Sequence, residues 1–399
     1  MKTNIKKRKK WLKTQQTTPN EQPNNSDIIV GNTLVLKESE VRDNYILLGE
    51  GATVQDHTII LGKGGGGDEP TLEQFSCLVE HLGSEDMNDV TFTKSENFPT
   101  ADNGFYFLAI DDWGNYYSRF NTYYRRNIIE EGKLTGFEIA SYKKSDEFEP
   151  YPCFVDEQGN VLPYILIGQY AGSQKWVEGV GYITSVSTLS TMQNGKIYDQ
   201  QRTLAKNMGV GYQFFDANMH SFIRDLTLVL YGGLDKQRDM IFGMKTNYTY
   251  GVARNPACCF IDGIFRYNKD YYYCDKPSKY VSTFSLDNTD YVKLSYGLVG
   301  FDNTAIKLVK EVGYDSRYPF INIASVGTSP VNFPDDETNY YGVTASDTTA
   351  WSGSTRKNQG LWLGQRQQRR PYQMQLDTWS NGDGYYRICY RPISEEETL

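Results

Sequence analysis

The side chains best suited to ligand binding lie near the C-terminus, within residues 346–386. This segment mixes aromatic rings with amide, guanidinium and hydroxyl groups, which can stack on the apolar faces of sugars and hydrogen-bond to their hydroxyls. The residues that we expect to face a ligand are Trp351, Gln365, Arg366, Tyr372 and Trp379. A core position beneath long loops explains the three aromatic residues equally well, and a solvated turn explains Gln365–Arg370 better. For Trp362 we expect a core position, because a leucine lies on each side of it in the sequence.

Acids and histidines in this sequence do not form a catalytic pattern. Glycan hydrolysis needs two carboxylates roughly 5–10 Å apart in a groove, and adjacent acids occur at Asp111–Asp112 and Asp335–Asp336. Neighbours on a strand point to opposite faces, so each pair is a poor dyad. The spacing of His57, His81 and His220 assembles no Ser/His/Asp or Cys/His set, and His220 is expected to be exposed. We therefore expect no catalytic residues and no enzyme activity.

Metal and cofactor signatures are also missing from the sequence. None of the six cysteines forms a CxxC motif, and the adjacent Cys258–Cys259 is awkward for a disulfide or a zinc site. Reduced, partly buried thiols are the expected state. Calcium would need 6–8 convergent oxygens, and a solvated loop explains Pro334–Glu337 better. The Gly62–Gly67 run lacks the Lys-Ser/Thr of a phosphate loop. We expect no bound metal and no cofactor.

The composition indicates a soluble globular protein, and its charges are distributed unevenly along the chain. The 399 residues are 39% hydrophobic and 23% charged, and no apolar run reaches the roughly 18 residues of a membrane span. The net charge is −8, yet residues 1–13 carry seven basic side chains and no acid. The rest of the chain is therefore strongly acidic, which argues against a specific nucleic-acid-binding domain, and the lack of a long apolar run argues against membrane insertion.

The basic N-terminus is a candidate anchor. Its residues are Lys6, Lys7, Arg8, Lys9, Lys10 and Trp11, which could contact an acidic protein surface, nucleic acid or a membrane face. A solvated, disordered end is an equal alternative. The stretch is not expected to be a secretory signal, because no apolar core follows it.

The pattern along the chain predicts four segments. Residues 1–27 are predicted to form a basic N-terminal anchor. It should be flexible, because the polar stretch after the basic residues is rich in Gln, Asn and Pro. Residues 28–67 predict a short β-rich stalk or oligomerisation segment ending in a glycine linker, with a small sheet of the next domain as the alternative. Residues 68–146 predict an intermediate, mostly β module, in which 72–82 could form a short helix. Residues 147–395 predict an α+β domain.

Two helices and a terminal strand define the last segment. A turn at Asp156–Asn160 predicts a hairpin, and Tyr198–Gly209 predicts a short helix that Gly209 terminates. A longer helix should begin at the N-cap Asp216 and end at Tyr231. Arg224 and Asp225 lie off its apolar stripe, which consists of Met219, Phe222, Ile223, Leu226, Val229 and Leu230. Alternation through Tyr386, Ile388 and Tyr390 predicts a final strand.

The order of these pieces resembles a known group of phage proteins. The pieces are "YPCFVDEQGNVLPYILIGQYAGS", the segment "DQQRTLAKNMGVGYQFFDANMHSFIRDLTLVLYGGLDKQ", and then "CFIDGIF", "YPF", "NYYGVTASD", "GLWLGQ" and "GYYRICYRP". Over 151–393 they resemble fibre proteins with a C-type-lectin-like domain, of the formylglycine-generating-enzyme-like and tropism-determinant-like type, in phages of gut Bacteroidetes. The resemblance depends on the positions Arg202, Ala205, Gly209, Gly211, Tyr231, Gly232, Gln237, Arg387, Tyr390 and Pro392.

The resemblance implies a fold and a place of action. The fold would be a C-type-lectin-like domain with two helices packed on small antiparallel sheets, long loops forming a ligand face, and a terminal strand beside the opening one. The protein would be assembled in the host cytoplasm into a virion, as a head or tail fibre or capsid decoration subunit for host attachment. Expected partners are other copies of the chain, as a trimer, other virion proteins at the N-terminus, and a host-surface glycan or protein.

Departures from related families leave the alternatives open. Formylglycine-generating enzymes use a cysteine pair late in the domain, whereas Cys389 stands there alone. Calcium-binding C-type lectins use Glu-Pro-Asn or Gln-Pro-Asp and Trp-Asn-Asp motifs, and neither is present in 147–395. One alternative is a purely architectural capsid or tail component without a host ligand. Another, less favoured, is an enzyme of the formylglycine-generating type or a glycan depolymerase.

Overall fold

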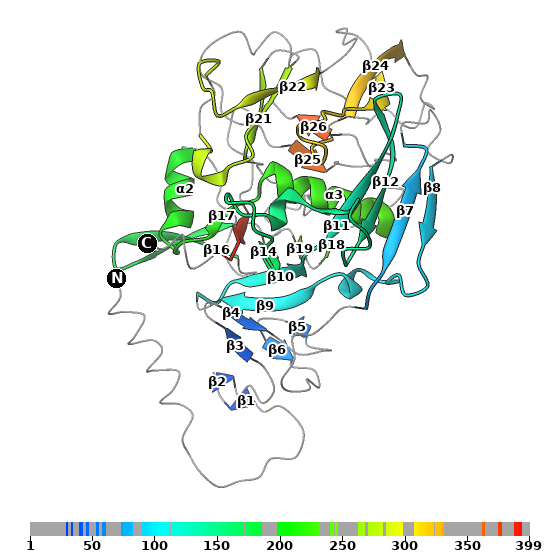
Figure 1. Cartoon of the computed structure of the whole chain (residues 1–399). Helices are drawn as coiled ribbons and strands as arrows, with labels where there is room; N and C mark the ends of the chain where they lie inside the picture. The colour runs from blue at the N-terminus through cyan, green and yellow to red at the C-terminus, as the bar shows by residue number, and fades with distance from the viewer. Residues whose placement is uncertain are drawn as a thin grey trace. The chain divides into compact units, whose positions relative to one another are not determined.

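The protein is sheet-rich, with a mixed α+β architecture of many antiparallel strands and few helices (Figure 1). The computed structural model describes the following residues: 73–82, 90–111, 113–170, 172–185, 198–231, 240–242, 244–245, 262–267, 270–281, 285–297, 307–322, 324–330, 361–363, 374–376 and 387–392, with six short strands between 29 and 60. No helix in these ranges is both long and apolar enough to span a membrane.

The chain divides into two compact units. Unit 1 comprises Met1–Ser39 and Gly49–Gly66, and unit 2 comprises Glu40–Leu48 and Gly67–Leu399. Within unit 1, two short antiparallel pairs are described: β1 (Ile29–Val30) with β2 (Thr33–Leu34), and β5 (Thr53–Gln55) with β6 (Thr58–Ile60).

The larger sheet of unit 2 draws its strands from distant parts of the sequence. Its order is β17-β27-β14-β10-β9-β4-β3, and all of its pairings are antiparallel. Two of its strands come from within 28–67, and β10 pairs directly with β14 across position 147. The strands are β3 (Glu40–Arg42), β4 (Tyr45–Leu47), β9 (Phe107–Asp111), β10 (Tyr116–Asn121), β14 (Tyr164–Gly168), β17 (Tyr212–Phe214) and β27 (Ile388–Tyr390).

A second, five-stranded sheet has the order β13-β11-β12-β7-β8. Its strands are β7 (Ser76–Glu80), β8 (Thr91–Lys94), β11 (Tyr124–Glu130), β12 (Lys133–Ala140) and β13 (Glu149–Pro150). The helix expected within 72–82 is wrong, because Ser76–Glu80 is extended. Cys77 and Val79 alternate into the core while Leu78 is only half-buried, so the period of burial is two.

The remaining elements of the described residues are two α-helices, three short 3-10 helices and several small antiparallel sheets. The helices are α2 (Tyr198–Lys206), α3 (Ala217–Tyr231), η2 (Asp102–Gly104), η3 (Pro152–Phe154) and η4 (Pro277–Lys279). The small sheets are β15 (Ser173–Val177) with β16 (Val180–Thr184), β18 (Met240–Ile241) with β19 (Met244–Lys245), β20 (Ile264–Tyr267) with β21 (Asp270–Tyr273) and β22 (Val292–Gly297), β23 (Lys307–Val312) with β24 (Ala324–Pro330), and β25 (Leu361–Leu363) with β26 (Met374–Leu376).

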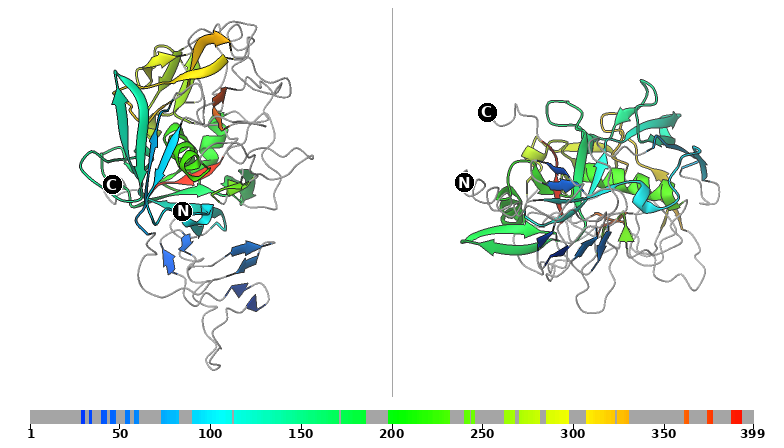
Figure 2. Two further views of the ribbon diagram at one scale, coloured as in Figure 1. Left: turned by 90° about the vertical axis from the view of Figure 1, so that its right-hand side faces the viewer. Right: turned by 90° about the horizontal axis from the view of Figure 1, so that it is seen from below.

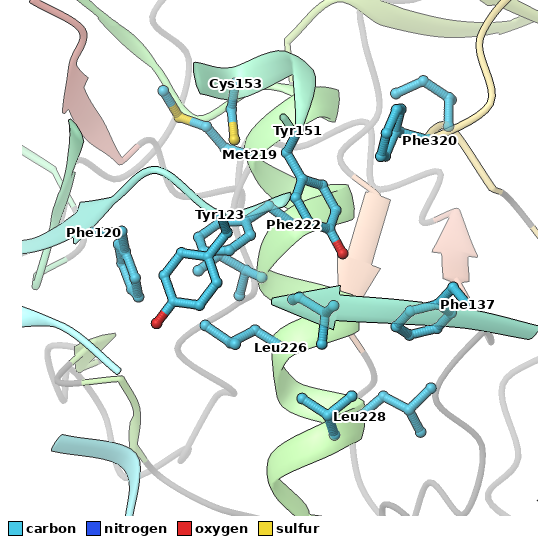
Figure 3. Close-up of a cluster of buried hydrophobic side chains, with 14 of the residues drawn as sticks. Phe120, Tyr123, Phe137, Tyr151, Cys153, Met219, Phe222, Leu226, Leu228 and Phe320 are labelled. Atoms are coloured by element: carbon cyan, nitrogen blue, oxygen red, sulfur yellow. The ribbon is translucent and has the colours of Figure 1, made fainter. Parts of the chain in front are cut away.

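Helix α3 runs through the main core of unit 2, as Figure 3 shows around Phe222. The Phe222 ring lies 5.1 Å from the rings of Tyr123 and Phe154, and 5.3 Å from those of Phe120 and Tyr151. Edge-to-face contacts at such distances add to the stabilisation from burial. The predicted stripe is confirmed, with only Leu230 half-buried.

The polar face of α3 is buried as well. Ser221, Arg224, Asp225 and Thr227 are each at most 3% exposed, although a surface helix would turn such residues to water. Strand β11, the N-cap residue of η3 and the segment before β24 cover this face, and each contributes a group that hydrogen-bonds to it. The helix is therefore central, and its polar residues need partners inside the protein.

The turn predicted at Asp156–Asn160 is confirmed, but the hairpin around it is reduced to one antiparallel bridge between Val155 and Val161, because Pro152–Phe154 forms η3 instead of a strand. Asp156 Oδ1 accepts hydrogen bonds from the backbone N–H groups of Gln158 and Asn160, at 2.9 and 2.7 Å. After α2, Gly211 has φ +88°, and a Cβ there would lie 2.3 Å from the carbonyl oxygen of Arg391. A glycine is therefore required where the last strand passes closely.

Candidate functional site: buried polar clusters around α3

The first cluster is centred on Asp216, the N-cap of α3. Its Oδ1 accepts the N–H of Met219 at 2.9 Å, as a capping carboxylate should. Its Oδ2 accepts hydrogen bonds from Arg391 Nη2 at 2.6 Å, Gln213 Nε2 at 3.1 Å and the Tyr280 hydroxyl at 3.2 Å. The Asp216 and Arg391 side chains are 0% and 8% exposed, so the ion pair joins the helix start to the residue after β27 inside the protein.

A second carboxylate, Asp262, lies next to Asp216. The two residues form a parallel bridge, in which the Ala217 N–H donates to the Asp262 carbonyl at 2.9 Å. Arg202 of α2 makes a bidentate pair with Asp262, at 2.9 Å from Nε and 2.6 Å from Nη2, and also donates to the Val281 carbonyl. Burial raises the pKa of Asp262, and the Arg202 guanidinium opposes this rise.

Together these pairs form the Asp216 cluster: Asp216, Asp262, Arg202 and Arg391. It balances two carboxylates with two guanidinium groups and connects α2, α3, the segment around 262 and the end of β27. Both carboxylates use both of their oxygens in hydrogen bonds. The arrangement therefore suits holding these elements together, since neither carboxylate is open to a reacting group.

The second cluster, the Asp225 cluster, lies in the middle of α3 and comprises Asp225, Arg125 and Arg224. Asp225 Oδ2 accepts Arg125 Nη1 at 2.6 Å and the Tyr151 hydroxyl at 3.1 Å. Its Oδ1 accepts Arg224 Nε and Nη2 at 3.1 and 3.0 Å. All three charged side chains are at most 1% exposed, so two positive charges share one negative charge in the core.

Arg125 is held by ring contacts as much as by its ion pair. Its guanidinium carbon lies 4.5 Å from the centre of the Phe137 ring and 5.6 Å from that of Phe320. Its Nε and Nη2 have no hydrogen-bond partner within the described part of the chain. Contacts with aromatic faces partly replace the missing acceptors for a buried cation.

Arg224 links the Asp225 cluster to the segment before β24. Its Nη1 donates to the Asn322 carbonyl, and Asn322 Nδ2 donates to the carbonyls of Gly313 and Pro319 at 3.1 and 3.2 Å. From β11, Asn127 Nδ2 also donates to the Pro319 carbonyl at 3.0 Å. Residues 313–322 are thereby fixed against α3 and the five-stranded sheet.

Asp111 forms a third buried centre at the end of β9. It accepts hydrogen bonds from the backbone N–H groups of Trp113 and Asn115, from Asn115 Nδ2, and from the hydroxyls of Tyr117 and Tyr212. Burial raises its pKa to about 6, and the donors oppose this rise. The expectation that the Asp111–Asp112 pair would make a poor dyad rests on Asp112 as well, which lies outside the described residues.

His220 is buried, so its expected exposure is wrong. Only 1% of the residue is accessible, its ring meets the Phe215 ring edge-on at 6.4 Å, and Nε2 has no partner among the described residues. Burial and the nearby Arg224 charge lower its pKa to about 3. The apolar stripe does not predict this burial, because the polar face of an amphipathic helix ordinarily meets water.

The described cysteines are free thiols, as expected. Cys77, Cys153, Cys274 and Cys389 are all buried, and burial raises the pKa of Cys77 to about 12 and that of Cys274 to about 11. Such thiols stay protonated and unreactive. Across the ranges that the structure describes, no group of three or more His, Cys, Asp or Glu side chains could hold a metal ion.

Most residues that the sequence singled out lie outside the described residues. These are Trp351, Gln365, Arg366, Tyr372 and Trp379 of the expected ligand face, Lys6, Lys7, Arg8, Lys9, Lys10 and Trp11 of the expected anchor, and also His57, Cys258–Cys259 and Asp335–Asp336. What sequence reasoning did not find is the set of buried ion pairs. Arg224 and Asp225 were recognised only as lying off the stripe, and their partners are far away in the sequence.

Comparison with family models and curated proteins identifies no relative of the chain. No protein-family model matches the chain, and no curated protein matches it in sequence. The motif order and the geometry of unit 2 therefore carry the functional argument.

Proposed function

We propose that the chain is a structural protein of a tailed-phage virion. It serves as a head or tail fibre subunit or a capsid decoration subunit, and it displays a C-type-lectin-like domain that attaches the particle to the host surface. The proposal extends the motif resemblance over 151–393 with the arrangement of the elements that those motifs form.

The position of β27 is the observation that carries this proposal. The last described strand pairs with β14 on one side, through Leu166 and Tyr390, and with β17 on the other, through Tyr212 and Tyr390. Arg387 is 1% exposed and donates to the Gly168 carbonyl of β14. A terminal strand that returns beside β14 supports the C-type-lectin-like interpretation, because it joins the early and late parts of the segment 151–392 in one sheet, which β10 and β9 extend.

A frame of this kind suits the display of ligand-binding residues. In the sequence, residues 331–360 follow β24, residues 364–373 lie between β25 and β26, and residues 377–386 precede β27. These three segments contain Trp351, Gln365, Arg366, Tyr372 and Trp379. Binding residues commonly lie on connections held by a rigid scaffold, and the buried clusters around α3 provide the scaffold.

Assembly with other copies fits the strands of unit 1. Each of its described antiparallel pairs has strands of only two or three residues. Isolated two-stranded hairpins are marginally stable in water. Packing against sister chains, as in a trimer, and against other virion proteins would supply the missing contacts, with the basic residues Lys6–Lys10 and Trp11 as the proposed anchor.

Cell binding tests the proposal. The full chain with Trp351, Tyr372 and Trp379 all changed to Ala should bind gut Bacteroidetes cells at least about tenfold more weakly than wild type, because aromatic anchors dominate binding surfaces. Val210→Ala, which changes an exposed apolar side chain, is the control and should bind as wild type. Antibodies against the chain should also label intact particles. Unlabelled particles and no cell binding by the wild-type chain would refute the proposal, whereas labelled particles without cell binding would favour a purely architectural component.

A further inference from the structure

The β15–β16 hairpin presents the most exposed aromatic side chain in the described part of the chain. Glu178 and Gly179 at its turn have φ +52° and +82°, as in a tight hairpin turn with both central residues left-handed. Trp176, two residues before this turn, is 61% exposed. The hairpin extends from unit 2 beside α2, as Figures 1 and 2 show.

The Trp176 ring lies against a glycine on the neighbouring strand. Trp176 pairs with Gly181, and a Cβ at Gly181 would lie 3.2 Å from two ring carbons of Trp176 and 2.5 Å from Leu204 Cδ2. Asn207 Nδ2 donates to the Gly181 carbonyl at 2.8 Å and fixes this strand against the residue after α2. The missing side chain lets one part of the ring rest on the protein while the rest stays open.

The base of the hairpin is also held firmly. The Trp113 and Tyr182 rings stack with their centres 4.3 Å apart, on the strand face opposite that of Trp176. The Ser185 N–H donates to Asn115 Oδ1 at 2.8 Å, and the Tyr116 N–H donates to the Ser185 carbonyl at 2.9 Å. An aromatic ring on a rigid support loses little conformational entropy when it binds a ligand.

The surroundings of Trp176 favour a small ring-shaped ligand over a protein. Lys175 and Glu178 beside it are exposed and charged, and Gln174 is half-buried and polar. A stable protein interface needs about 800 Å² on each partner, whereas one aromatic side chain offers about 150–250 Å². A sugar ring has one apolar face of matching size and a hydroxyl rim that amide, ammonium and carboxylate groups can hydrogen-bond.

We propose that Trp176 binds one sugar ring of a host-surface glycan by stacking, as a contact residue additional to those proposed within 346–386. The inference rests on the proposed attachment function and names a second contact point with its ligand class. A second contact with the same glycan chain raises the overall affinity through effective concentration.

A bacterial glycan array probed with the full chain tests this site. Trp176→Ala should weaken array binding about tenfold, because a stacking contact contributes on the order of one factor of ten in affinity. Trp176→Phe keeps a flat ring and should retain most binding. Val210→Ala and Leu286→Ala are matched controls, since these apolar side chains are similarly exposed, at 63% and 56%, and should bind as wild type. Circular dichroism of all variants should show unchanged melting.

The outcomes separate this inference from the proposed function. Array binding that Trp176→Ala leaves unchanged overturns the Trp176 site but not host attachment. Binding to bacterial cells without any array signal indicates a protein ligand and also overturns it. Absence of both cell and array binding removes host attachment and the inference together. Loss of array binding in Trp176→Ala alone, with retention in Trp176→Phe, supports the site.

Discussion

At the start of α3, Asp216 and Asp262 face Arg391 and Arg202, so that two carboxylates offset two guanidinium groups. In the middle of the same helix, Asp225 pairs with both Arg125 and Arg224. Both clusters are buried, but among the described residues one has equal numbers of carboxylates and guanidinium groups, whereas the other has one carboxylate for two guanidinium groups. The Asp225 cluster compensates through the Phe137 and Phe320 rings and through the Asn322 carbonyl.

The difference shows two ways of keeping charges inside a protein. The balanced cluster joins chain segments that are far apart in sequence, and each of its carboxylates is satisfied by several donors. Within the part of the chain that the structure describes, the Asp225 cluster has one carboxylate for two guanidinium groups, so its stability should depend strongly on Asp225. Buried pairs stabilise little relative to apolar packing, yet breaking one by removing a partner is costly. The two clusters should therefore respond differently to loss of an acid and loss of an arginine.

The largest effect is expected from Asp225→Leu. Each broken buried pair costs roughly 3–5 kcal/mol, and this change leaves two buried arginines without their carboxylate, so the protein should fail to fold stably. Urea denaturation followed by circular dichroism measures the loss. Asp146→Leu is the control, because its carboxylate is exposed and pairs only with Lys143 at the surface. A midpoint like that of wild type for Asp225→Leu would contradict the assigned role.

Loss of an arginine should lower the free energy of unfolding by different amounts in the two clusters. Arg391→Met removes the charge opposite Asp216 and should cost about 3 kcal/mol of unfolding free energy. Arg125→Met leaves Asp225 paired with Arg224 and removes two unpartnered nitrogens, so we expect a change of less than about 1 kcal/mol. Both free energies come from the same denaturation experiment. Equal losses for the two variants, or a larger one for Arg125→Met, would show that charge balance does not distinguish the clusters.

A smaller effect than the loss of Asp225 or Arg391 is expected from the response of α3 to acid. Unfolded His220 takes up a proton below its ordinary pKa of 6.5, whereas in the folded protein burial and Arg224 lower that pKa to about 3. The unfolded state thus binds more protons between these values, and stability falls as the pH drops. Between pH 7 and pH 5, wild type should lose about 2 kcal/mol more than His220→Leu.

Comparing the two proteins isolates His220 from other titrating groups. Asp111, whose pKa burial raises to about 6, acts in the opposite direction, because its folded form binds more protons than its unfolded form in this range. Wild type and His220→Leu share this contribution, so it cancels in the difference between their pH dependences. Identical pH dependence of the two denaturation midpoints would mean that His220 does not remain neutral and buried.

Local patterns predicted several elements of unit 2. The N-cap Asp216, the end of α3 at Tyr231, the turn at Asp156–Asn160 and the terminal strand all follow from signals within a few residues. Such features are governed by backbone hydrogen bonding and apolar periodicity, which act over short sequence distances. The extended conformation of Ser76–Glu80 was missed because a short apolar run fits both a helix and a strand, and pairing with β8 and β12 decided between them.

The sequence by itself determined that α3 is a helix, where it begins and which residues form its apolar stripe. Only the tertiary structure decided that its other face is buried too, because the partners of Arg224, Asp225 and Asp216 come from β11, η3, the segment before β24 and the residue after β27. Residues such as Arg125 and Asp225 are 100 positions apart, and charge pairing over that distance leaves no periodic trace in the sequence. Chain topology brings them together, and the low polarity of the core then makes pairing obligatory.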